Sequence, residues 1–335
     1  MKSVYLGGWI LMAAIALCAL LISKLVVVGG REPLEPAIIA ILIGMLLRNR
    51  RRVPAECEPG VKKSEHLLMA GIVLMGAELH FARLVQQGSA ILTIIIVTML
   101  AGIAAIYVIG RLLRLPRALA LLLSVGTTIC GGTAIAIVAP ILRAPEDETS
   151  YAIGTISLWG LAAILTYPVI AHRLGVSDVV FGVFAGTAIH STPQVVGAGF
   201  VYSELAGHTA TAVKLVRNCF IAPVVLAVAL SEAPRQATGG VSASSLRKAF
   251  PWFLFGFFIL AGLNSAGLLG GGAARLMGSA GKHLMLVGMA GVGLNTNLGT
   301  FRVIGLRPLA VGLIGSLVVA LVSATMIGSM LGATP

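Results

Sequence analysis

Charged residues are scarce in this sequence. Only 11% of its 335 residues are Asp, Glu, Lys or Arg, whereas a soluble domain uses about a quarter. Apolar runs of about 20 residues recur along the chain instead, and each is long enough to cross a ~30 Å hydrocarbon core as a helix. The composition therefore excludes a soluble domain and predicts an all-α, polytopic protein that is embedded in a lipid bilayer.

Cysteines and enzyme motifs are also rare. The four cysteines, Cys18, Cys57, Cys130 and Cys219, have neither the spacing of a zinc site nor that of a disulfide framework. No G-x-S-x-G elbow, P-loop or H-E-x-x-H motif occurs in the sequence. We therefore expect no metal, no cofactor and no enzymatic activity.

Acidic residues are half as numerous as basic ones, and the net charge is +12. No basic cluster belongs to a soluble module that could carry it to a nucleic acid, so we expect no nucleic-acid partner. With the N-terminus in the cytoplasm, 16 of the 24 Lys and Arg residues fall on the cytoplasmic side and 5 on the other. By the positive-inside rule, this asymmetry predicts an inner or plasma membrane protein with a cytoplasmic N-terminus.

Charged residues, Pro and Gly divide the chain into about eleven predicted spans. The predicted spans are 4–28, 34–47, 65–82, 88–110, 117–142, 149–171, 178–200, 206–230, 249–267, 279–298 and 306–331. The run 4–28 is too long for a signal-peptide core and predicts a retained extra helix. We interpret 34–171 as a first repeat and 178–331 as a second, within one transmembrane domain over 1–335.

Two internal similarities bear on this repeat. Residues 69–84 resemble 286–301, and the two segments lie seven spans apart, as an inverted repeat requires. Residues 126–140 resemble 186–199, but these segments lie two spans apart. Simple inversion does not explain the second pair unless the number of spans is wrong.

A polar, glycine-rich cluster interrupts the predicted span 117–142. It contains Thr127, Thr128, Cys130, Gly131 and Gly132. Such residues weaken a helix at membrane depth, where an unsatisfied backbone group costs several kcal/mol. One interpretation is a discontinuous helix whose freed N–H groups favour an anion. The alternative is close helix packing through small residues.

A second cluster, His190-Ser191-Thr192-Pro193-Gln194, interrupts the predicted span 178–200. Proline removes a backbone donor, and His190 could bind or relay a proton near neutral pH. A lone buried histidine is often only a hydrogen-bonded packing residue. The hydroxyl and amide neighbours favour a binding site.

Further polar residues lie in other predicted spans. Lys214 and Arg217 share a helix face with Asn218 nearby, and they either face a cavity or reach toward the membrane interface. Glu78 could pair with these cations, couple protons, or lie at the interface. Asn295 and Asn297 occupy the corresponding end of the similar segment 286–301 and add neutral donors and acceptors.

Several motifs together are similar to those of a known family. They are GIVLMGAEL (71–79), GTTICGGTAIAIVAPILRAPEDE (126–148), IHSTPQVVGAG (189–199), VKLVRN (213–218), PWFLFGF (251–257) and LNS (263–265). The sequence resembles the sulfate-exporter family of YeiH-like bacterial inner-membrane proteins over nearly its whole length. That family is grouped with cation/proton antiporters and bile-acid-type transporters, so the resemblance implies inverted repeats and two broken helices that cross at mid-membrane.

Carried over to this sequence, the resemblance implies roles for Thr128 and Cys130-Gly131-Gly132 in the first cluster, and for His190 and Gln194-Val195 in the second. Members of the family often have an acidic residue after the histidine, where this chain has Ser191. They also have small apolar residues in place of Thr192-Pro193. These differences make the pocket less negative and put the coupling ion and the substrate in doubt.

The leading hypothesis is a secondary carrier that exports a small anion such as sulfate, a sulfonate or an organic acid by alternating access. The two clusters would bind the anion, Lys214 and Arg217 would compensate its charge, and His190 or Glu78 would couple a proton or another ion. A sodium- or proton-coupled carrier of a neutral or cationic solute is the alternative. A membrane sensor or scaffold without transport activity is a second alternative. The family resemblance also implies a homodimer.

Overall fold

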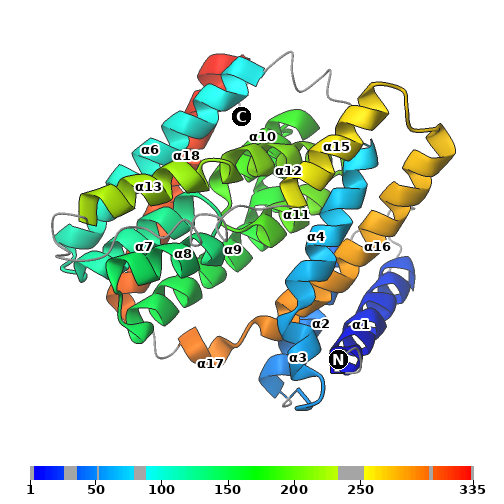
Figure 1. The fold of residues 1–335 in the computed structure, drawn as a ribbon, viewed down its shortest axis with the longest axis horizontal. Coiled ribbons are helices and arrows are strands. Elements are labelled where there is room, and N and C mark those ends of the chain that lie inside the picture. Colours follow the sequence, from blue (N-terminus) through cyan, green and yellow to red (C-terminus); the bar gives the residue numbers. More distant parts are fainter. Residues whose placement is uncertain are drawn as a thin grey trace. The chain divides into compact units, whose positions relative to one another are not determined.

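The computed structural model describes residues 4–25, 36–50, 53–78, 88–232, 253–301 and 305–332, and these residues form helices joined by short turns (Figure 1). The ends of some predicted spans, such as 26–28 and 79–82, lie outside this set. Five of the helices are long and apolar enough to cross a membrane: Leu6–Leu25, Gly88–Leu112, Glu146–Arg173, Glu204–Glu232 and Leu306–Leu331.

The chain forms two compact units, each built from two stretches of sequence. Unit 1 comprises Met1–Gln86 and Trp252–Gly299, and unit 2 comprises Gln87–Pro251 and Thr300–Pro335. The helices of unit 1 are α1 (Leu6–Leu25), α2 (Pro36–Arg50), α3 (Glu58–Lys62), α4 (Ser64–Met75) with the 3-10 turn η1 (Gly76–Glu78), α15 (Phe253–Ser265) and α16 (Gly271–Asn295). The short helix α17 (Leu298–Phe301) lies at the boundary between the two units.

Glycine contacts hold α4 against α16 in unit 1. A Cβ atom added at Gly71 would lie 2.7 Å from the carbonyl oxygen of Gly281, and one added at Gly281 would lie 2.8 Å from that of Gly71. The two backbones therefore touch directly, as small residues allow in membrane helix pairs. On another side of the unit, α1, α2 and α16 share an apolar core that includes Met12, Ile39 and Leu294.

The described residues of unit 2 form four long helical paths and four half-length helices. Its helices are α6 (Gly88–Leu112), α7 (Arg117–Thr128), α8 (Gly132–Leu142), α9 (Glu146–Arg173), α10 (Asp178–Ala188), α11 (Thr192–Tyr202), α12 (Glu204–Asn218), α13 (Ile221–Glu232) and α18 (Leu306–Leu331). Pro116 and Pro145 precede α7 and α9 at the N-cap, where proline fixes an extended entry to the helix. α6 and α18 lie side by side (Figure 1).

Helices α7 and α8 fold back on each other. The side chain of Ile135, on α8, lies 2.8 Å from the position of a Cβ atom added at Gly126 on α7. In one continuous helix these two residues would be about 13 Å apart. At the open end, the Glu148 carboxylate in the first turn of α9 faces the backbone amide of Leu119 near the start of α7. The pair α7–α8 is therefore a helical hairpin whose tip is 129–131.

Helices α10 and α11 form a second hairpin. The ring of Tyr202, at the end of α11, stacks on that of Phe181, near the start of α10, with centroids 4.1 Å apart. The hydroxyl of Tyr202 also donates to the carbonyl oxygen of Val176, just before α10. The chain thus returns to its starting level, and the tip of this hairpin is 189–191.

The two hairpins point in opposite directions along α9. The first half of α9 packs on α7, where Ile156 contacts Gly126. The second half follows α11 and ends where His172 stacks on Tyr202. Helices α12 and α13 pass both hairpins in the reverse direction, from the open end of α10–α11 to an ion pair between Glu232 and Arg117 at the open end of α7–α8.

This arrangement differs from the layout expected for 117–142 and 178–200. Each segment was predicted to be one interrupted span that crosses the other, and each instead folds back on itself. The reason is that 23 and 26 residues, the lengths of these segments, are enough for one full crossing or for two half-crossings. Hydropathy does not distinguish the two.

Candidate functional site

The tips of the two hairpins meet inside unit 2. A Cβ atom added at Gly131 would lie 2.9 Å from the Cβ atom of Ser191. Gly131 has a φ of +73°, a conformation in which a side chain is strained. Glycine at this position therefore permits both the turn of the first tip and the close approach of the second.

Lys214, on α12, connects the two tips. Its Nζ atom donates to the carbonyl oxygens of Ile129 (2.7 Å), Ile189 (3.1 Å) and His190. The side chain is 0% exposed. A neutral amine has only two N–H groups, so three carbonyl oxygens around one nitrogen favour the charged ammonium form, which has three.

Arg217, one turn further along α12, makes the same kind of connection. Its guanidinium donates to the carbonyl oxygens of the last residues of α7 and α10 and to that of Ile189, with all three nitrogens engaged. The acceptors are Thr127 (2.9 Å), Thr128, Gly186 (3.2 Å), Thr187 (2.8 Å) and Ile189 (3.0 Å). Arg217 and Lys214 thus satisfy the C-terminal carbonyl groups of both half-helices.

The cations have no acidic partner among the described residues. None of the ion pairs there involves Lys214 or Arg217. The C-terminal ends of α7 and α10 and the N-terminal ends of α8 and α11 all meet at the tips, and their partial charges of roughly −0.5 and +0.5 each cancel. The two side chains therefore leave the meeting point positive.

The N-terminus of α8 is accessible beside the tip. A Cβ atom added at Gly132 would have nothing within 4 Å, and Thr133 is exposed. The Cys130 thiol faces the Ala134 amide of this first turn. Since the first N–H groups of a helix have no acceptor within the helix, this end offers donors next to open space.

The N-terminus of α11 is organised by a capping box. Ser191 is the N-cap residue, and its amide donates to Gln194 Oε1 over 3.1 Å. The amide nitrogen of Asn218 lies 3.2 Å from the hydroxyl of Thr192, while its Oδ1 atom is buried without a partner. The oxygen and nitrogen of an amide group are assigned from hydrogen bonds alone. The Asn218 amide can therefore turn either its N–H groups or its oxygen toward a ligand at this end of α11.

Two threonines of the first cluster have different surroundings. The Thr128 hydroxyl donates to the carbonyl oxygen of Ser124 over 2.6 Å and is engaged within its own helix. The Thr127 hydroxyl is buried and has no partner. Of the two hydroxyl groups, that of Thr127 still has its hydrogen to donate to a further group, whereas that of Thr128 can only accept.

His190 faces α18. Its Nε2 atom and the Ser316 hydroxyl are 2.8 Å apart, and its Nδ1 atom is buried without a partner. Thr187 on α10 similarly shares a 2.6 Å hydrogen bond with Ser323. Sequence analysis missed these two serines, although their spacing of seven places both on one face of an apolar helix.

The remaining predicted residues lie in unit 1. Glu78 Oε2 is 3.5 Å from the Nζ atom of Lys282 in the same unit. Glu78 therefore pairs with Lys282, whereas Lys214 or Arg217 was the partner expected from the sequence. Asn295 donates to the Val61 carbonyl oxygen (3.0 Å) and to Ser64, and Asn297 accepts from the Gly299 amide (2.9 Å). These contacts connect elements of unit 1 locally.

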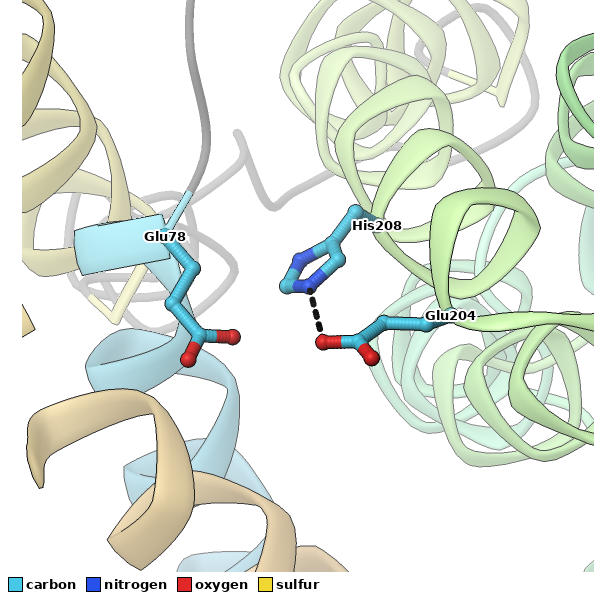
Figure 2. Close-up of side chains that lie close together, drawn as sticks. All are labelled: Glu78, Glu204 and His208. Atoms are coloured by element: carbon cyan, nitrogen blue, oxygen red, sulfur yellow. Dashed lines mark ion pairs between the residues drawn. The ribbon is translucent and has the colours of Figure 1, made fainter. Parts of the chain in front are cut away.

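The start of α12 contains a pair of ionisable side chains that was not predicted from the sequence. His208 Nε2 lies 3.9 Å from Glu204 Oε1, and Figure 2 shows the two side chains facing each other. Their spacing of four residues on one helix was the available signal. The pair lies at the opposite end of α12 from Lys214 and Arg217, so it does not contribute to the meeting point of the tips.

The fold and this buried charged centre define a helical membrane protein. The family model described as "Conserved hypothetical protein 698" matches residues 7–312, and the chain belongs to the UPF0324 membrane protein family. A UPF0324 membrane protein of Clostridium tetani is 28% identical over 95% of both chains. Another, from Nitratidesulfovibrio vulgaris, is 32% identical over 82% of this chain and 78% of its own. One from Brucella melitensis is 32% identical over 88% and 82%.

The relatives' names confirm the prediction of a membrane protein, in agreement with the five apolar helices. They name no substrate. The resemblance to a sulfate-exporter family therefore stays a prediction.

Proposed function

We propose that the protein is a secondary carrier that exports a small anion, such as sulfate or a sulfonate, across the bacterial inner membrane. The observation that carries this proposal is the pair Lys214 and Arg217, which are 0% and 1% exposed and have no carboxylate partner among the described residues. Uncompensated charge is costly at membrane depth and marks a solute path. An anion at the hairpin tips would neutralise it.

The ligand groups for the anion are the first N–H groups of α8 and the Thr192 N–H of α11, with the Asn218 amide beside the Thr192 hydroxyl. The buried Thr127 hydroxyl is a further donor without a partner. The donors of Lys214 and Arg217 already serve carbonyl oxygens. These two residues therefore attract the anion by their charge and do not ligate it. Helix N-termini bind anions through the amides that the helix leaves unpaired.

The hairpins suit alternating access. We propose that α7–α8 and α10–α11 are re-entrant hairpins that enter the membrane from opposite sides and are flanked by α6, α9, α12–α13 and α18. Their tips meet between the two sides, so movement of either one would open the anion site to one side only. The exporting direction and the inner membrane follow from the family resemblance.

Charge asymmetry orients this arrangement. The open end of α7–α8 carries Arg111, Arg114, Arg117 and Arg143, whereas the open end of α10–α11 carries Arg173. By the positive-inside rule, the first end is cytoplasmic. This assignment keeps the expected cytoplasmic N-terminus and places the acidic turn at the start of α9 on the cytoplasmic side.

Uptake of labelled sulfate and of a labelled alkyl sulfonate into proteoliposomes tests the proposal. Ser191→Asp should lower anion uptake at least tenfold, because a carboxylate at the N-cap of α11 repels an anion in a medium of low dielectric constant. The variant should keep its melting temperature, since Asp caps a helix as well as Ser does. Unchanged uptake by this variant, or no uptake of either anion by the native protein, would overturn the proposal.

The matched control is Ser177→Asp. Ser177 is also an N-cap serine, exposed at the open end of α10. The Ser177→Asp variant should transport the anion at the native rate. A loss of transport in Ser191→Asp alone would then be due to the position of the added charge at the hairpin tip and not to the exchange of Ser for Asp.

A further inference from the structure

The carbonyl oxygens around Lys214 have the chemistry of a cation site. Those of Ile129, Ile189 and His190 converge on one point from the C-terminal ends of α7 and α10. These are the negative ends of the two helix dipoles. Carriers with interrupted helices commonly bind a coupling Na⁺ with such carbonyl groups and helix ends.

In this protein a side chain occupies that point. The Lys214 ammonium has three N–H groups, and each has one carbonyl oxygen as its acceptor. Arg217 takes the neighbouring carbonyl oxygens of Thr127, Thr128, Gly186 and Thr187. Because the buried Lys214 Nζ atom already occupies the point where the three oxygens converge, a second cation cannot take the same position.

We infer that Lys214 is a tethered replacement for a coupling metal cation. The ammonium gives the hairpin tips the charge that a bound Na⁺ would otherwise supply, and it stays with the protein when the solute leaves. This inference rests on the proposed function and deepens it. The anion then moves without a co-transported metal cation, and its transport does not require Na⁺.

The first test uses the native protein. Sulfate efflux from proteoliposomes is measured in sodium gluconate and in N-methylglucamine gluconate at equal pH and ionic strength. We expect rates that agree within twofold. A tenfold or larger requirement for Na⁺ would overturn the inference.

The second test removes the Lys214 ammonium from its position between the three carbonyl oxygens. Lys214→Ala removes the ammonium and leaves the buried carbonyl oxygens of Ile129 and His190 without a donor, while that of Ile189 keeps its hydrogen bond from Arg217. The melting temperature in detergent should therefore fall. Methylammonium, ammonium or Na⁺, added as gluconate salts, should raise it again in proportion to occupancy. The native protein and the control Lys24→Ala, which alters an exposed lysine at the end of α1, should show no such response.

The outcomes of the two tests separate the inference from the proposed function. A Lys214→Ala protein that folds and responds to none of these cations overturns the tethered cation. Rescue of its stability in a protein that carries no anion supports the tethered cation and discards the carrier. If Lys214→Ala does not fold in any of these salts, the Na⁺ requirement of the native protein decides.

Discussion

Gly131 and Gly132 are adjacent in the sequence but have different tasks. Gly131 combines a positive φ with the close approach of Ser191, whereas Gly132 faces open space. The sequence predicted a helix break from this pair. It could not show which glycine the turn requires, because that depends on a second hairpin about 60 residues away in the chain.

Gly131→Ala should therefore destabilise the protein far more than Gly132→Ala. The added methyl group at 131 meets the Cβ atom of Ser191 and forces a residue other than glycine into a strained conformation, at a cost of about 1–3 kcal/mol. At 132 the change should stay within about 1 kcal/mol, since alanine favours a helix over glycine. Thermal unfolding in detergent measures both, and equal melting temperatures would contradict the assignment.

The contacts of Lys214 and Arg217 could be predicted only in part. Their spacing of three placed them on one helix face, and the positive character of the centre followed from that. Their acceptors could not be foreseen, because backbone carbonyl oxygens carry no sequence signal. The hydrogen bond from Arg217 to Thr127 joins residues 90 positions apart.

At the scale of elements, the half-length helices explain why the two similar segments 126–140 and 186–199 lie two predicted spans apart, a spacing that simple inversion does not explain. Residues 126–140 and 186–199 lie at the two hairpin tips, and α9 is the one long helix between them. If each hairpin enters and leaves on one side, the segments enter from opposite sides, which inversion requires. Inversion seemed excluded only because each of 117–142 and 178–200 was counted as one crossing of the membrane.

Cysteine labelling tests this topology. In a background without native cysteines, Leu112→Cys and Asp147→Cys should react with an impermeant maleimide from the same side of the membrane. Ser177→Cys and Leu205→Cys should react from the other side. Both members of each pair lie at the open end of one hairpin and are exposed.

If 117–142 and 178–200 were instead two spans that cross the membrane once, the two cysteines of each pair would lie on opposite sides of the membrane and would react from opposite sides. Labelling of Leu112→Cys and Asp147→Cys from opposite sides in sealed vesicles would thus contradict the re-entrant hairpins. The same reagent applied after permeabilisation controls for reactivity at each position.

At the scale of the whole molecule, the sequence was sufficient to identify an all-helical membrane protein, because apolar length is a local property. The number of spans, the inverted repeat and the homodimer remain predictions. They depend on how distant segments face one another, and neither hydropathy nor charge specifies that. Glu78 illustrates the limit, since its partner Lys282 is about 200 residues away.

A carrier with a tethered cation should respond to membrane voltage. If a divalent anion crosses without a companion cation, a 100 mV inside-negative potential favours its export by about 4.6 kcal/mol. Efflux of labelled sulfate from proteoliposomes should accelerate when valinomycin and a K⁺ gradient impose that potential, and slow when the gradient is reversed. Sulfate efflux rates that do not change with the potential would indicate that the overall exchange moves no net charge across the membrane.

The hydrogen bonds of α12 also set an order on biogenesis. The first hairpin is synthesised long before Arg217 leaves the ribosome, and its tip lacks donors for the carbonyl oxygens of Thr127 and Thr128 until then. At 5–20 residues per second this interval lasts roughly 5–20 seconds. We expect the nascent α7–α8 segment to stay at the translocon or the membrane surface during this time and to reach its full depth when α12 is inserted.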